Sequence, residues 1–83
     1  MNYQMVFTKN AVKDIEKLDF LAKKRLKKKL ELLRQDPLKV SKKLIDSKLG
    51  QYRYRIGDHR VIFDLDKNSI VVLKIGHRKE IYR

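Results

Sequence analysis

Hydrophobic and polar residues alternate differently in the two halves of the chain, and each pattern predicts its own kind of secondary structure. Residues 3–7 form a short, moderately apolar run without breakers, which predicts a strand. Thr8 follows as a candidate helix N-cap. Apolar residues then recur at the helical period, at Val12, Ile15 and Leu18. The chain is therefore expected to begin with a strand and to continue into a helix.

A second helical pattern begins after Asp19, whose carboxylate also suits an N-cap. Its apolar stripe repeats at i, i+4, i+8 and i+11 and consists of Ala22, Leu26, Leu30 and Leu33. The helix is expected to end before Pro37, because proline cannot continue it. Two neighbouring helices with one apolar face each predict an αα-hairpin. A polar connection with little periodicity follows at residues 38–50.

From Tyr52 onward the pattern changes to the two-residue period of β-strands. Residues 52–56 alternate between apolar and polar, and residues 59–65 alternate again. Between them, Gly57-Asp58 suits the two-residue turn of a β-hairpin. This segment therefore predicts two antiparallel strands.

The rest of the chain predicts one more long strand. Residues 66–68 suit a three-residue turn in which Asn68 takes the left-handed conformation. Residues 69–76 form the strand after it. The predicted fold class is α+β, with an N-terminal strand, a two-helix hairpin and a three-stranded antiparallel meander that completes one sheet. One domain is expected to span residues 1–83, because a chain of this length has no room for a second core.

The turns predict which residues share a sheet face, since residues directly opposite each other point to the same side. The two-residue turn pairs Ile56 with His59, Tyr54 with Val61 and Tyr52 with Phe63. A three-residue second turn places Leu65 opposite Ser69, which adds Val71, Leu73 and Ile75 to the same, helix-covered face. The other face, called the arginine face below, then carries Arg53, Arg55, Arg60, Asp64 and Lys74.

The arginine face is the first candidate for a functional site. Arg55 is expected directly opposite Arg60, and like charges opposed across two strands are destabilising. A bound anion would remove this objection. Exposed arginines are also common on open sheets, so a merely solvated face is the alternative. Three arginines and Lys74, with Asp64 as the only acid among them, favour an anion-binding site.

Charge and composition narrow the possible partners. The 83 residues include 22 Lys and Arg against 10 Asp and Glu, a formal net charge of +12, which favours polyanions. RNA, DNA, an acidic protein and an anionic membrane all satisfy that charge. No apolar run reaches the roughly 18 residues of a membrane span, and the N-terminus lacks the layout of a secretory signal, so a cytoplasmic protein without membrane attachment is expected. Cysteine is absent and no metal-ligand spacing or glycine-rich phosphate loop occurs, so neither a metal nor a cofactor is expected.

The second predicted helix concentrates much of the positive charge. Its cations surround the apolar stripe and are Lys23, Lys24, Arg25, Lys27, Lys28 and Lys29. They form either a solvated helix face or a surface that follows RNA phosphates. No aromatic residue lies between them, so base stacking is not expected there.

Two segments of the second half resemble a known family. The segments LGQYRYRIGDHRVIF (residues 49–63) and IGHRKEIY (residues 75–82) are similar to the C-terminal half of RelE-type toxins. The predicted order of strands and helices resembles the same RelE/ParE superfamily over essentially the whole chain. The resemblance implies a toxin of a type II toxin–antitoxin pair that cleaves messenger RNA in the ribosomal A site without a metal. The family's catalytic positions fall on Arg53, Arg55, Arg60, Arg78 and Tyr82.

The resemblance also implies partners and further contacts. Expected partners are an acidic cognate antitoxin, the ribosome and messenger RNA, with operator DNA bound only indirectly through the antitoxin complex. Further candidates for binding RNA are Lys48, Lys74, His77 and Lys79. Because arginine cannot be deprotonated in proteins, Tyr82 is the best candidate for the general base.

This chain departs from the family pattern in two respects. RelE-type toxins commonly carry lysines where this sequence has Arg53 and Arg55, so any proton transfer by those lysines would move to Tyr82, His59 or His77. A further C-terminal helix found in some members is not expected. Two other functions stay open, namely a ParE-like poison that binds DNA gyrase without catalysis, and a degenerate toxin that only binds its antitoxin and operator.

Overall fold

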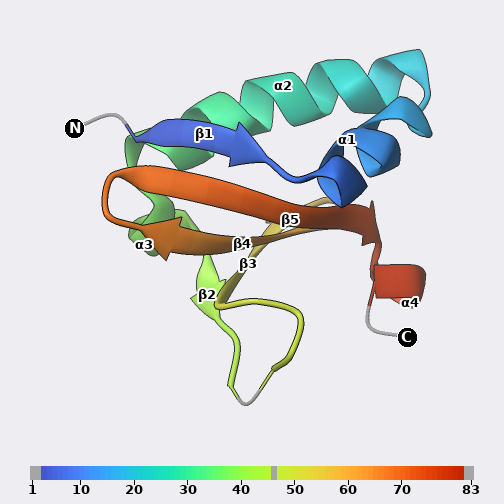
Figure 1. The fold of residues 1–83 in the computed structure, drawn as a ribbon. Helices are drawn as coiled ribbons and strands as arrows, with labels where there is room; N and C mark the ends of the chain where they lie inside the picture. Colours follow the sequence, from blue (N-terminus) through green and yellow to red (C-terminus); the bar gives the residue numbers. More distant parts are fainter. Residues whose placement is uncertain (1–2, 46, 82–83) are drawn as a thin grey trace.

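The computed structural model describes residues 3–45 and 47–81, which form one mixed sheet with the two long helices on the same side (Figure 1). In chain order the elements are β1 (Gln4–Phe7), α1 (Lys9–Glu16), α2 (Phe20–Gln35), α3 (Pro37–Val40), β2 (Lys42–Lys43), β3 (Tyr52–Ile56), β4 (His59–Asp66), β5 (Ser69–His77) and α4 (Arg78–Ile81). The strand order is β1-β5-β4-β3-β2, with β1 parallel to β5 and the other neighbours antiparallel. The predicted α+β fold class is confirmed.

Both predicted helix starts carry side-chain caps. The Thr8 hydroxyl accepts a hydrogen bond from the Ala11 amide at 3.1 Å, and an Asp19 carboxylate oxygen accepts one from the Ala22 amide at 2.8 Å. These bonds satisfy amides that the first turn of a helix leaves without a backbone partner. Helix α2 ends at Gln35, before Pro37, as predicted.

The core lies between the helices and one face of the sheet. Helix α2 contributes the predicted residues Leu26, Leu30 and Leu33, all buried. The predicted Ile15 of helix α1 and Leu18 after it pack against the core, but the predicted Val12 is 43% exposed and Ala11 is fully buried in its stead. The cause is Asp14, whose carboxylate accepts a hydrogen bond from the Ile75 amide of β5 at 2.9 Å. Ala11 and Asp14 are three residues apart on one helix face, so this bond turns Ala11 towards the sheet.

The first hairpin has the predicted register. Tyr52 lies opposite Phe63, Tyr54 opposite Val61, and Ile56 opposite His59. Gly57 has φ +59° in the turn, a conformation that glycine adopts without strain. The buried side of this hairpin therefore follows directly from its alternating pattern.

The second hairpin differs from the prediction. Its turn has two residues rather than three, since Asp66 pairs with Ser69, and Lys67 rather than Asn68 takes the left-handed conformation with φ +56°. A β-bulge then shifts the ladder between Ile62 and Phe63, where Lys74 and Val72 are the respective partners. The bulge places one extra residue, Leu73, in β5.

The two-residue turn and the bulge together decide which side chains of β5 reach the core. Ile70 and Val72 are fully buried against the helices, so the predicted core positions Val71 and Leu73 are wrong. Val71 instead lies opposite Asp64 on the other face. The extra residue restores the predicted parity, and Ile75 is a core residue opposite Val61.

The polar connection and the C-terminal segment contain short elements that were not predicted. Helix α3 and the two-residue strand β2 lie within residues 37–43, and β2 pairs with β3 at the sheet edge. After β5, α4 forms one helical turn. It packs through the fully buried Ile81, which lies over Gly76 on the arginine face. Within the described residues, no helix has the length and apolar character needed to cross a membrane.

Candidate nucleic-acid interface

A row of cations crosses the arginine face from one strand to the next. Lys42 of β2 lies opposite Arg53 of β3, Arg53 lies opposite Ile62, and Ile62 lies opposite Lys74 of β5. Directly opposed residues share a face, so Lys42, Arg53 and Lys74 point to the same side of the sheet. Arg53 and Arg55 also line a pocket with Lys42. Lys42 could not be placed on this face from the sequence, because a two-residue strand has no detectable period.

The cations of this row carry unbalanced charge. Within the described part of the chain, the ion pairs are Arg34 with Glu31 and Arg78 with Asp58, so Arg53, Arg55 and Lys74 pair with no carboxylate. Uncompensated arginines can bind phosphate oxygens through two parallel hydrogen bonds. The arrangement therefore suits a polyanion laid across β2 to β5.

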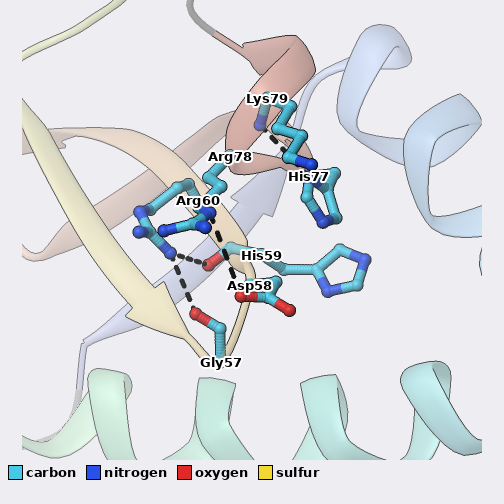
Figure 2. A network of polar contacts seen from close by, with 7 residues as sticks. All are labelled: Gly57, Asp58, His59, Arg60, His77, Arg78 and Lys79. Carbon is cyan, nitrogen blue, oxygen red and sulfur yellow. Dashed lines mark hydrogen bonds and ion pairs between the residues drawn. The ribbon is translucent and has the colours of Figure 1, made fainter.

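Arg60 lies opposite Arg55, as predicted, but its environment differs (Figure 2). Only 4% of Arg60 is exposed. One terminal nitrogen donates hydrogen bonds to the backbone carbonyls of Gly57 and His59, both at 3.0 Å. The partial negative charges of these carbonyl oxygens compensate the positive charge of Arg60, which lies opposite the positive charge of Arg55. Arg60 therefore holds the β3–β4 turn.

Arg78 binds the same turn from the C-terminal side. Its amide donates to the Asp58 carbonyl at 2.8 Å, and its Nε lies 4.0 Å from the Asp58 carboxylate. Figure 2 shows Arg60 and Arg78 on the same side of the strands, with Asp58 below them. The turn thus brings together the two arginines that the sequence places 18 residues apart, and Arg78 stays exposed.

The two histidines lie on the other side of the sheet. His59 and His77 are directly opposite each other in the ladder, with ring centroids 5.9 Å apart in an edge-to-face arrangement. Their neighbours include Leu18 of the helical layer, and Figure 2 shows both rings pointing away from Arg60. His77 Nδ1 accepts a hydrogen bond from the Lys79 amide at 3.1 Å. The structure therefore separates His77 from the arginines.

The other candidate residues have different positions. Lys79 is exposed on α4, Lys48 is exposed on the β2–β3 loop, and Lys74 is half-buried. Lys48 and Lys74 line one hollow of the arginine face. Tyr82 lies outside the described residues. Among the tyrosines described, burial raises the pKa of Tyr54, which belongs to the core.

Comparison with known proteins gives a consistent result. The family model for the ParE toxin of the type II toxin–antitoxin system parDE matches residues 5–82. Toxin RelG of Mycobacterium tuberculosis is 32% identical, and the match covers 100% of this chain and 99% of RelG. Toxin RelE3 of Methanocaldococcus jannaschii is 29% identical, with 95% of this chain and 94% of RelE3 covered.

Solved structures agree with these sequence matches. The chain resembles one chain in the crystal structure of the toxin–antitoxin complex RelBE2 from Mycobacterium tuberculosis, with a TM-score of 0.85 and 27% identity. That match covers 94% of this chain and 100% of the other. Both the fold and the order of its elements are therefore those of a known toxin structure.

Proposed function

Because the chain belongs to the RelE/ParE superfamily of type II toxin–antitoxin toxins, we propose that it is a ribosome-dependent endoribonuclease that cleaves messenger RNA without a metal. The supporting observation is the row of Lys42, Arg53 and Lys74, which form no ion pair with a described carboxylate, with Arg55 beside it and Arg78 at the adjacent turn. A surface of this kind neutralises successive phosphates of a single strand.

The proposed chemistry is attack of a ribose 2′-hydroxyl on the adjacent phosphate. The reaction needs a base for the hydroxyl proton, a proton donor for the leaving 5′-oxygen, and cations for the charge that develops on the phosphoryl oxygens. Arginine stays protonated, so the arginines serve as cations and hydrogen-bond donors. The exposed Arg55 and Arg78 are assigned to the reacting phosphate, and the half-buried Arg53 to its neighbour.

Arg60 has a different part in this proposal. Its buried guanidinium holds the turn through the carbonyls of Gly57 and His59. Asp58 lies between these two residues and forms an ion pair with Arg78. Arg60 therefore fixes the position of Arg78 and adds a positive charge close to the phosphate. His77 is given no contact with RNA, because it faces the helices.

The general base is assigned to Tyr82, from the family resemblance alone. A tyrosine has an ordinary pKa of about 10, and neighbouring arginines favour its phenolate. The arginines donate hydrogen bonds to the leaving 5′-oxygen, whose proton comes from water.

The cognate antitoxin is proposed to be acidic. The relative in the RelBE2 structure is part of a toxin–antitoxin complex. A net charge of +12 favours an acidic partner through charge complementarity. Contact with operator DNA is assigned to the antitoxin complex as a whole, and a ribosomal target places the protein in the cytoplasm.

The second candidate function is inhibition of DNA gyrase by binding, which the match to the ParE model favours. A purified translation reaction and a gyrase supercoiling assay separate the two. The ribonuclease stops translation and leaves supercoiling unchanged. A toxin that stops supercoiling while translation continues would be a gyrase poison.

A further inference from the structure

The arginine face is hollowed next to the cation row, between the β2–β3 loop and strand β5. Leu49 and Leu73 provide apolar walls, Lys48 and Lys74 provide ammonium groups, and Asp64 provides a carboxylate. We call this site the loop hollow. Lys48 and Lys74 are candidate RNA-binding residues, whereas Leu49, Asp64 and Leu73 have no part in the proposed cleavage.

The loop wall of the hollow is held in place by Gln51. Its backbone N–H donates a hydrogen bond to the Asp64 carboxylate at 2.8 Å, and its backbone carbonyl accepts one from the Leu44 backbone N–H at 2.8 Å. Its side-chain oxygen accepts a hydrogen bond from the Leu65 backbone N–H at 2.9 Å. Gly50 lets the loop approach the sheet, since a Cβ there would lie 2.7 Å from Ile62 Cγ2. The hollow is therefore already formed, and a ligand would not need to order the loop.

The loop hollow shares Lys74 with the cation row but differs from it in the carboxylate of Asp64. Asp64 Oδ1 is bonded to Gln51, while its other oxygen makes no hydrogen bond or ion pair with a described residue. A carboxylate only accepts hydrogen bonds, and the lysine ammonium groups only donate them. Asp64 would repel a phosphate. An acceptor beside two donors, between apolar walls, instead suits a flat neutral group that carries both kinds of partner on one edge, as a nucleobase does.

The hollow lies within reach of a strand bound to the arginines. Lys74 and Arg53 are separated by the single strand β4, so their backbones are about 10 Å apart at the usual strand spacing. This span corresponds to a neighbouring nucleotide of the same RNA. We propose that the loop hollow binds one base beside the cleaved phosphate, that Asp64 and Lys74 read its edge, and that guanine is preferred.

The preference for guanine follows from its edge. Guanine carries two adjacent N–H donors, at N1 and N2, which match the two oxygens of a carboxylate, and its O6 beside them accepts from Lys74. Uracil offers one donor, and the adenine and cytosine edges offer an amino group without a second N–H beside it. A pairing of this kind discriminates between bases by about tenfold or more. The inference rests on the proposed binding of RNA, but not on cleavage.

The test measures binding without cleavage. Fluorescent hexauridine, 2′-O-methylated throughout, is compared with the same strand carrying one guanine or one inosine, which lacks the N2 amino group. The guanine strand is expected to bind the wild-type protein about tenfold more tightly than hexauridine, with the inosine strand between them. Equal affinity for all three strands would overturn the proposal.

Asp64→Asn is the decisive variant, because the side-chain oxygen of the new asparagine can still accept a hydrogen bond from the backbone N–H of Gln51. It should remove the guanine preference without weakening the binding of hexauridine. Asp66→Asn, which neutralises an exposed carboxylate on the same strand, should keep the preference. A preference that survives Asp64→Asn would contradict the assigned site. A guanine preference without any messenger RNA cleavage would instead refute the proposed enzyme and leave the loop hollow in place.

Discussion

Arg55 and Arg60 lie directly opposite each other across β3 and β4, yet Arg55 is exposed while Arg60 is only 4% exposed and bonded to two turn carbonyls. Two residues of the same type on one sheet face thus have different environments. An exposed guanidinium can move to a ligand, whereas a buried one fixes the backbone around it. The two arginines should therefore respond differently to the same substitution.

Arg60→Ala is expected to lower the free energy of unfolding by about 2 kcal/mol or more, because it leaves the carbonyls of Gly57 and His59 without their charged donor. Arg55→Ala should change it by less than about 0.5 kcal/mol, since an exposed side chain is removed. Urea denaturation at neutral pH measures both. Equal stability of the two variants would mean that Arg60 does not hold the turn.

Arg55 should affect the rate of messenger RNA cleavage strongly and the free energy of unfolding only slightly. Arg55→Ala is expected to reduce messenger RNA cleavage by about 10²-fold, as for the loss of one donor to a developing negative charge. Lys13→Ala removes an exposed cation from the helical side and is the matched control. The assigned role of Arg55 fails if both variants cleave at the wild-type rate.

The approach of the β2–β3 loop to the sheet should require glycine at position 50. Gly50→Ala places a Cβ 2.7 Å from Ile62 and 2.8 Å from Leu73, and we expect it to destabilise the fold by about 1–3 kcal/mol. Gly76→Ala is the control, because its Cβ would lie 3.9 Å from Ile81, an ordinary contact. Thermal melts of the two variants that superimpose would show that the loop is not packed in this way.

The fold should lose stability at alkaline pH because of Tyr54. Burial raises its pKa above the ordinary 10.0. Below pH 10 the residue is neutral in both states, and its contribution is complete. Above that pH the unfolded chain loses the proton first, so the free energy of unfolding falls by up to about 1.4 kcal/mol per pH unit until the folded pKa is passed. Tyr54→Phe should remove this part of the slope, and denaturation of both proteins between pH 9 and 11 tests it. Parallel slopes would contradict it.

Binding of the acidic antitoxin should weaken as salt rises, because part of the attraction is screened. Calorimetric titration of the purified antitoxin at several salt concentrations measures the effect. An affinity that is constant from low to high salt would exclude charge complementarity as a main source of binding.

The sequence predicted the first hairpin in full, because a two-residue Gly-Asp turn leaves one register and the alternation of Tyr52 to Phe63 then assigns both faces. It could not predict the bulge at Leu73. A bulge inserts one residue without changing the apolar character of the strand. The continuous apolar run of β5 is therefore compatible with either assignment of its side chains to the two sheet faces. The predicted three-residue turn places Val71 and Leu73 on the helix-covered face, whereas the observed two-residue turn moves both to the other face and the bulge restores the parity at Ile75.

The candidate site was partly predictable for the same reason. The positions of Arg53, Arg55 and Lys74 follow from strand parity, and the register confirms their common face. The burial of Arg60 depends on how its side chain turns towards the backbone, which periodicity does not describe. Position in the sequence can also mislead, as His77 shows. Its neighbour Arg78 binds the turn, whereas the His77 ring points to the helices.

Primer extension on a messenger RNA in a purified translation system tests the central claim most directly. Wild type is compared with Arg78→Ala and Tyr82→Phe. We predict cuts within codons for the wild type, and their loss or a reduction of about 10²-fold in both variants. Intact transcripts with continuing translation in the presence of the wild-type protein would contradict the claim that this toxin is an endoribonuclease.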